Sequence, residues 1–180
     1  SLEIFSIIFP ELKHVNFFSK LSLIQKDLLK ENDFIFLLSL ILIDETDNVD
    51  YFLYKFNISK KDQKRLKLID NFYKEKINSK SFSINKMNKI FYYHGKQTVI
   101  DILNYRIIKY RGLDKTLIDM SALFQKKDTP IMPVNADLLM TKYNIPEGKQ
   151  LGVKLKSIEQ EWVNNNFKIS DQQIDNIINN

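Results

Sequence analysis

Apolar side chains recur every three or four residues through most of this chain, and few residues interrupt the pattern. Only four glycines and four prolines occur among 180 residues. A spacing of three to four places side chains on one face of an α-helix, whereas a half-buried strand needs strict alternation. The sequence therefore predicts an all-α protein with almost no strand.

Helix start and stop signals divide the chain into segments. Ser59, with Asp62 three residues later, has the spacing of a capping box, and His94 with Gly95 predicts a break between two helices. Residues 34–43 are apolar on all sides apart from Ser39, which indicates a central helix. The expected helices cover residues 21–30, 34–43, 51–56, 60–76, 83–93, 97–110 (ending near Gly112) and 113–124, then a short helix after Asn135 and a longer one to Trp162.

One polar segment that contains two prolines is the best candidate for a domain boundary. The sequence KKDTPIMP at residues 126–133 has the composition of a linker. We therefore predict a helical body domain over residues 1–125. A small helical tail over residues 134–180 should contain a helix-turn-helix hairpin with two glycines in its turn and helix start.

Composition excludes several classes of protein and of site. The chain has 27 basic and 22 acidic residues, no cysteine and two histidines. Without cysteine there is neither a disulfide framework nor a thiolate metal site, and two histidines alone cannot build a tetrahedral zinc site. The longest apolar run falls well short of the roughly 20 residues that span a bilayer. Because the chain begins at Ser1 without a signal-peptide pattern, we interpret it as trimmed.

No segment has the pattern of a catalytic or metal site. The acidic residues 44–50 superficially resemble a calcium loop, but Val49 stands where that loop needs glycine and Lys55 where it needs glutamate. Phosphate-binding glycine loops and glycine-flanked serine nucleophiles do not occur. His14 and His94 are interpreted as structural or surface residues. No catalytic residue and no metal ligand is assigned.

Lysines are concentrated in the first turns of the helix predicted from residue 60. Lys60, Lys61, Lys64 and Lys67 lie there. Cations at a helix N-terminus oppose the helix dipole, so this placement is mildly unfavourable and hints at an anionic partner. A solvated, lysine-rich face is the alternative, and the sequence leaves both open.

The segment IPEGKQLG at residues 145–152 carries two of the four glycines. A glycine-bearing turn that leads into a helix exposes unpaired backbone N–H groups, which favour an anion such as phosphate. Lys149 and Lys156 are predicted to lie opposite the apolar face of that helix. The alternative is a tight turn whose glycines, Gly148 and Gly152, permit close helix packing.

Short segments spread over the chain resemble, in order, the body and tail of bacterial class II tRNA nucleotidyltransferases and poly(A) polymerases. Two positions depart from that pattern, because Asn57 replaces an arginine and Asn135 a glycine. The similar segments are FPEL at 9–12, FNISK at 56–60 followed by Arg65, FYYHGKQ at 91–97 followed by Asp101, and NADLLM at 135–140 with IPEGKQLG at 145–152 followed by Glu159, Glu161 and Trp162.

The resemblance implies a non-catalytic region that holds tRNA, or another structured RNA, so that its 3′ end reaches a head domain. In that family the head carries paired aspartates and the neck selects the nucleotide, and neither motif occurs in this chain. Mg²⁺ and CTP or ATP are accordingly expected only in a head domain, and this chain alone is expected to be inactive. A cytoplasmic protein with head and neck domains as partners, and no membrane, is also implied.

The predicted RNA contacts combine the two lysine-rich segments. Tyr105 with Arg106, and Tyr110 with Arg111, are further candidates for stacking on RNA, although Tyr110 falls on the predicted core stripe of its helix, which favours a packing role there. The alternative function is an all-helical protein–protein interaction module. The predicted RNA-binding residues are Lys60, Lys61, Lys64, Arg65, Lys67, Lys142, Gly148, Lys149, Gly152, Lys154 and Lys156.

Overall fold

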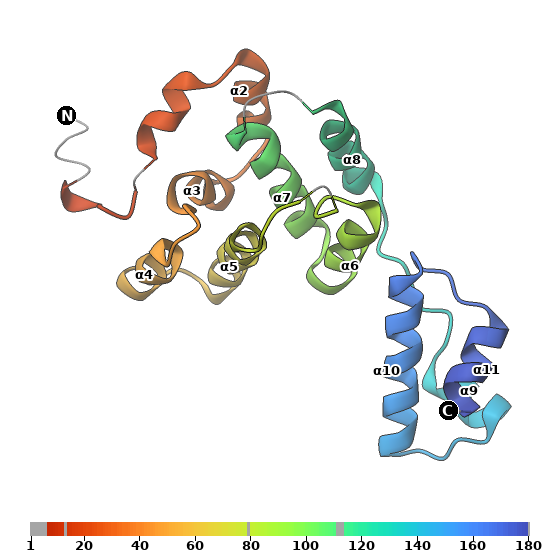
Figure 1. Cartoon of the computed structure of the whole chain (residues 1–180). Helices are drawn as coiled ribbons and strands as arrows, with labels where there is room; N and C mark the ends of the chain where they lie inside the picture. The colour runs from red at the N-terminus through yellow and green to blue at the C-terminus, as the bar shows by residue number, and fades with distance from the viewer. Residues whose placement is uncertain (1–6, 13, 79, 111–113, 180) are drawn as a thin grey trace. The chain divides into compact units, whose positions relative to one another are not determined.

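All regular secondary structure in the part of the chain that the structure describes is helical, with no strand, which confirms the predicted all-α class (Figure 1). This computed structural model describes residues 7–12, 14–78, 80–110 and 114–179. The predicted helix end at Gly112 lies outside those residues. The elements are η1 (Val15–Lys20, a 3-10 helix), α2 (Leu23–Lys30), α3 (Phe34–Leu42), α4 (Asn48–Lys55), α5 (Lys60–Lys74), α6 (Ile84–His94), α7 (Lys96–Lys109), α8 (Lys115–Lys126), α9 (Ala136–Tyr143), α10 (Lys149–Asn164) and α11 (Asp171–Asn179).

Short polar side chains begin many of these helices by accepting a backbone N–H that lacks an intrahelical partner. Asn135 accepts the N–H of Leu138 at 2.8 Å, as the sequence predicted for the short helix α9. Ser59 accepts the N–H of Asp62 at 3.2 Å, which confirms its place as the N-cap of α5. In a capping box, the side chain three residues on also accepts the backbone N–H of the N-cap residue. Here the Asp62 carboxylate instead accepts a hydrogen bond from the Ser59 hydroxyl at 2.6 Å.

Gly95 separates α6 from α7 at the predicted break. Its backbone has φ 86° and ψ 168°, a combination that is essentially restricted to glycine. The Gly95 N–H still donates to the carbonyl of Phe91 at 2.9 Å, so α6 closes normally before the chain changes direction. A single glycine therefore converts one long apolar pattern into two helices.

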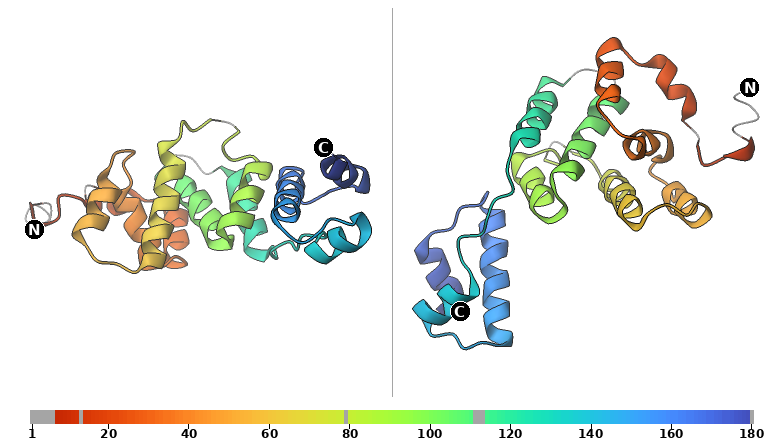
Figure 2. Two further views of the ribbon diagram at one scale, coloured as in Figure 1. Left: turned by 90° about the horizontal axis from the view of Figure 1, so that it is seen from below. Right: turned by 180° about the vertical axis from the view of Figure 1, so that it is seen from behind.

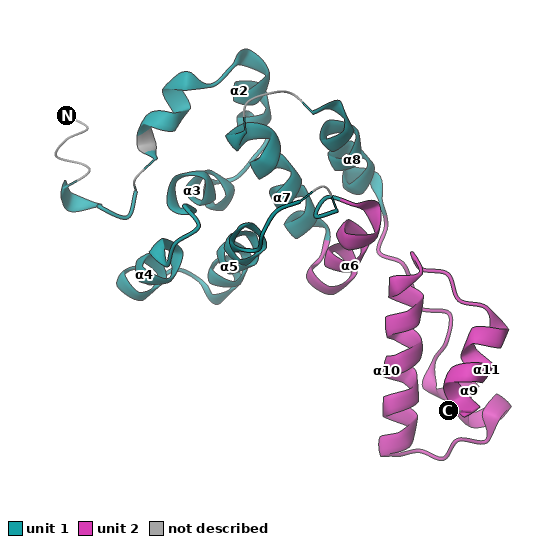
Figure 3. Cartoon of the chain, viewed as in Figure 1, with its two compact units in different colours: residues 1–82, 96–127 teal, residues 83–95, 128–180 magenta. Residues whose placement is uncertain are grey.

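The first of two compact units contains residues 1–82 and 96–127 and is built around α7 (Figures 1 and 3). Helix α7 packs against α2, α3, α5 and α8, and most of its residues are buried. The views in Figure 2 show α5 between α4 and α7, in agreement with its contacts. Helix α3 supplies Phe36, Leu40 and Leu42, all with no exposed surface. The apolar run at 34–43 is thus a helix in the core, although Phe34 at its start is 70% exposed.

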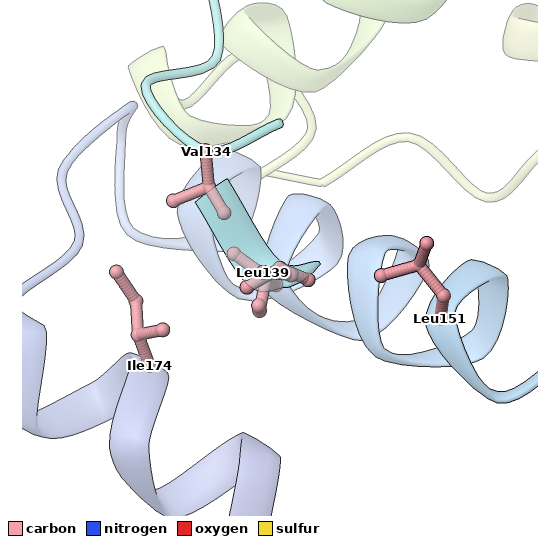
Figure 4. Close-up of a cluster of buried hydrophobic side chains, with 5 residues drawn as sticks. Val134, Leu139, Leu151 and Ile174 are labelled. Atoms are coloured by element: carbon pink, nitrogen blue, oxygen red, sulfur yellow. The ribbon is translucent and has the colours of Figure 1, made fainter. Parts of the chain in front are cut away.

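The second unit contains residues 83–95 and 128–180, with α6, α9, α10 and α11 (Figure 3). Figure 4 shows Val134, Leu139, Leu151 and Ile174 converging from different segments, and Ile158 belongs to the same buried cluster. The compact units thus place α6 with the C-terminal helices. The predicted domains, residues 1–125 and 134–180, stay a prediction from the sequence.

Aromatic contacts attach α6 to α10 within the second unit. The Tyr92 ring centroid lies 5.3 Å from that of Trp162, which lies 5.0 Å from that of Phe167. The Tyr92 hydroxyl donates to Glu159 Oε1 at 2.7 Å. Burial, together with this bond to a carboxylate, raises the pKa of Tyr92 to about 12. Tyr92 therefore stays protonated as a donor at neutral pH.

Candidate nucleic-acid interface

One side of α10 carries an exposed row of residues that we call the α10 stripe: Lys149, Gly152, Val153 and Lys156. Their spacing of three, four and seven residues places them on one side of the helix. All four are exposed. The stripe therefore presents two cations with a glycine and a short apolar side chain between them.

The opposite side of α10 faces the core of the second unit. Leu151, Ile158 and Trp162 are buried there, with at most 5% of their surface exposed. This burial confirms the prediction that Lys149 and Lys156 lie opposite the apolar face. Helix amphipathicity thus directs both ammonium groups to solvent.

The first turn of α10 lacks a side-chain cap. Its N-cap is Gly148, which has no side chain to accept a hydrogen bond, and the turn contains no acidic residue. The Gly148 carbonyl accepts the N–H of Gly152 at 3.3 Å, so the N–H groups of residues 149–151 precede the first intrahelical bond. The helix dipole and Lys149 contribute positive charge at this end, while the exposed Glu147 precedes the N-cap.

The space around Gly148 and Gly152 shows whether packing within the chain requires glycine at these two positions. A Cβ atom added at either position would find no other atom within 4 Å, so close packing within the described residues explains neither glycine. Gly148 has φ 147° and ψ −166°, a conformation that other residues rarely adopt. Gly152 lies inside a helix, where glycine is unfavourable. Backbone conformation therefore accounts for Gly148, whereas Gly152 has no structural reason within the described chain.

Alanine is expected to have opposite effects on stability at these two positions. Gly152→Ala should raise the free energy of unfolding by about 0.5–1 kcal/mol, because alanine favours the helix and meets open space. Gly148→Ala should lower it by about 1–3 kcal/mol, because alanine strains this backbone conformation. Urea unfolding of each variant measures both changes, and a destabilising Gly152→Ala would show that the glycine has a packing role after all.

Two other predicted contact residues in the second unit are engaged in local interactions. Lys154 Nζ donates to the carbonyl of Ile177 at 2.9 Å, in the last turn of α11. Lys142 Nζ lies 3.8 Å from Asp171 Oδ1 and 5.1 Å from the centroid of the Tyr143 ring. Lys154 thus has a helix-capping role, and it differs in this respect from the lysines of the α10 stripe.

In the first unit, the predicted lysines of α5 lie in its first two turns. Lys60, Lys61 and Lys64 are exposed, and within the described part of the chain none of them forms an ion pair. Lys67 is also exposed, but its Nζ lies 2.9 Å from Asp50 Oδ1. The α5 lysines available to an anion are therefore the first three. They belong to a different compact unit from the α10 stripe, and each surface is considered by itself.

Arg65, also predicted as an RNA contact, has its donors directed at carboxylates of its own unit. Its Nε and Nη2 donate to the two oxygens of Asp101 at 2.6 and 2.8 Å, and Nη1 donates to Asp33. Burial lowers the pKa of Arg65, but the hydrogen bonds to Asp101 and Asp33 outweigh it and raise the pKa overall. Asp101 has no exposed surface. Arg65 is thus a structural residue in this geometry.

The two tyrosine–arginine pairs have different surroundings. Tyr105 is only 3% exposed, and its hydroxyl donates to the carbonyl of Ile43 at 3.2 Å, which leaves no ring face for RNA. Tyr110 is 37% exposed, and the guanidinium carbon of Arg106 lies 3.6 Å from its ring centroid. Arg111 lies outside the described residues. Among the described members of these pairs, Arg106 with Tyr110 can therefore contribute to a ligand surface.

Sequence reasoning missed a cavity beside Arg106. Its volume is about 540 Å³, and its walls come from the segment before α6, from α7 and from the start of α8. The spacing of four residues between Arg106 and Tyr110 was the only signal in the sequence. Nothing local indicated that Phe82 and Asp114 would join them, because these residues meet only through the tertiary fold.

Among the residues described, no group of three or more histidine, cysteine, aspartate or glutamate side chains could hold a metal ion. Within those same residues, no helix is both long and apolar enough to cross a membrane. Comparison with known protein families, curated proteins and solved structures found no match to this chain. The resemblance to tRNA nucleotidyltransferases therefore remains a prediction from the sequence.

Proposed function

We propose that this chain binds folded RNA, with tRNA as the foremost ligand, through lysine-rich helix surfaces. The α10 stripe carries the proposal. It combines two exposed lysines, an uncapped helix N-terminus and a helical glycine with open space above it. Each feature favours phosphate, and the glycine allows a sugar–phosphate backbone to approach the helix closely.

Lysines suit structured RNA because its deep major groove hides the base edges. Proteins recognise such helices mainly by shape and by contacts to phosphates and 2′-hydroxyls. An ammonium group is a compact charge that contacts phosphate without a fixed orientation. The exposed Lys60, Lys61 and Lys64 of α5 provide a second surface of the same chemistry.

In this proposal the chain is the non-catalytic body and tail of a tRNA nucleotidyltransferase or poly(A) polymerase. A head and neck would add nucleotides to the 3′ end, with Mg²⁺ and CTP or ATP bound there and not in this region. The sequence resemblance supports this assignment. The cytoplasm, where tRNA is processed in bacteria, is the proposed location.

Charge reversal on the stripe tests the proposal. The double variant Lys149→Glu/Lys156→Glu should weaken tRNA binding by at least about tenfold at moderate salt, because two phosphate contacts are lost. Fluorescence anisotropy of labelled tRNA measures the affinity. Lys26→Glu/Lys168→Glu is the matched control, since it changes the net charge equally at two other exposed lysines. Equal losses in both double variants would mean that only net charge matters.

Salt dependence provides a second test of phosphate contact. Four phosphate contacts predict a slope of about −3 in the logarithm of affinity against the logarithm of salt concentration. Raising the salt fourfold should therefore weaken tRNA binding by roughly 50-fold or more. Anisotropy titrations at several salt concentrations give the slope, and a salt-insensitive complex would contradict phosphate recognition.

Exposed apolar residues at the start of the first unit favour a second candidate, a helical protein-interaction module. Leu23 is 80% exposed and Phe34 is 70% exposed. Exposed apolar side chains mark a protein contact where they form a contiguous patch. Polar substitution of both residues should leave tRNA affinity unchanged if RNA is the ligand of the lysine surfaces.

A further inference from the structure

The cavity beside Arg106 contains an unusual combination of groups, and all of them belong to the first unit. Arg106 is half-buried, and no carboxylate lies within ion-pair distance of it among the described residues. The guanidinium is held instead by aromatic rings, with its central carbon 3.6 Å from the Tyr110 centroid and 5.6 Å from that of Phe82. Stacking occupies the faces of the guanidinium and leaves its N–H edge for an acceptor.

A carboxylate and two neutral polar side chains line the same cavity as Arg106. Asp114 caps α8 with one oxygen, which accepts the N–H of Thr116 at 2.9 Å. Its other oxygen has no partner among the described residues. Asn78 and Thr116 add an amide and a hydroxyl, while Phe82 and Leu117 provide apolar walls. A bare anion would suit Arg106 but would be repelled by Asp114.

We propose that this cavity, the Arg106 pocket, binds an unpaired purine base of RNA, with a preference for guanine. Guanine offers two adjacent acceptors, O6 and N7, which match an arginine edge in a bidentate contact, and N–H donors that match a carboxylate. The apolar walls suit the flat ring, and a volume of about 540 Å³ lies within the range of small-ligand sites. The inference rests on the proposed RNA-binding function, which supplies the base.

The size of the effect follows from the bidentate contact. A bidentate arginine–guanine pair discriminates against other bases by about 1–3 kcal/mol, which is roughly 5-fold to 150-fold in affinity. The pocket should therefore prefer guanine to a pyrimidine by at least about fivefold.

Titration of the whole chain with guanosine 5′-monophosphate, followed by NMR amide shifts, tests the pocket without tRNA. Shifts should appear at Arg106, Thr116 and Leu117. Cytidine 5′-monophosphate should bind at least about fivefold more weakly, and inorganic phosphate should not reproduce the shifts. Equal binding of both nucleotides, or the same shifts with phosphate alone, would overturn the proposal.

Two variants test which side chains of the Arg106 pocket bind guanosine monophosphate. Arg106→Gln should weaken guanosine monophosphate binding about tenfold. Asp114→Asn keeps a good helix N-cap, so it should remain folded while it weakens guanosine monophosphate binding, because an amide group replaces the carboxylate oxygen that accepts the guanine N–H groups. Unchanged binding in both variants would sink the proposal.

The lysine-reversal variant separates this proposal from the proposed function. Lys149→Glu/Lys156→Glu should bind guanosine monophosphate like the unmodified chain. If tRNA binds but guanosine monophosphate does not, the pocket proposal fails and the proposed function stands. If neither binds, both fail.

Discussion

Replacing Asp101 with alanine is expected to lower the free energy of unfolding by about 3–5 kcal/mol. Asp101 is completely buried and accepts two hydrogen bonds from Arg65 and one from Gln97, at 2.6 to 2.9 Å. Without the carboxylate, a largely buried guanidinium keeps its charge and, among the described residues, retains Asp33 alone as an ionic partner. Urea unfolding followed by far-UV circular dichroism measures the loss.

An exposed ion pair of the same protein provides the control for Asp101. Asp27 pairs with Lys30 at 2.8 Å, and both side chains are more than 70% exposed. Asp27→Ala should therefore change stability by less than about 1 kcal/mol. If Asp101→Ala were no more costly than Asp27→Ala, the buried pair would have no special structural role. Adding Arg65→Met to Asp101→Ala should cost less than the sum of the two changes.

Truncation of Ile158 to alanine should destabilise the second unit by about 2–5 kcal/mol. Ile158 has no exposed surface and belongs to the cluster drawn in Figure 4, so the shorter side chain leaves a cavity. Trp162 is the only tryptophan and is 2% exposed. Its fluorescence emission therefore reports unfolding of this unit directly.

Val153 on the same helix is the matched control for Ile158. It is 55% exposed and belongs to the α10 stripe. Val153→Ala removes part of an exposed β-branched side chain, and we expect a change within about 0.5 kcal/mol. Similar losses at the two positions would contradict the burial of one face of α10.

Local patterns were sufficient to predict most of the helices and several of their ends, but η1 and α11 were not among the predicted helices. Asn135 and Ser59 cap helices through bonds to residues three positions away, and Gly95 breaks a helix through its own backbone conformation. The face of α10 that carries Lys149 and Lys156 followed from periodicity. In each case the deciding interaction lies within one or two helical turns.

Contacts between residues distant in the sequence could not be predicted from local patterns. Arg65 was predicted as an RNA contact because it lies in a basic segment. Its partner Asp101 lies 36 residues away, so no local pattern indicated the ion pair. Lys154 likewise caps α11 through Ile177, 23 residues further on. Periodicity predicted a helix over residues 83–93, but not that α10 would pack against it.

Several residues on which the sequence resemblance depends have structural roles. Arg65 and Asp101 come from two of the similar segments and form an ion pair. Tyr92 comes from a similar segment and contacts Glu159 and Trp162, which follow another. These residues hold helices of one unit together. The candidate RNA contacts are instead surface lysines, whose position on the exposed face of a helix follows from periodicity alone.

Direct titration of a labelled tRNA transcript with the purified chain is the most decisive measurement. We expect saturable binding in dilute buffer that exceeds binding to duplex DNA of equal length, weakens steeply with salt, and is lost preferentially in Lys149→Glu/Lys156→Glu. An absence of binding in dilute buffer, or equal affinity for tRNA and duplex DNA, would contradict the proposed function.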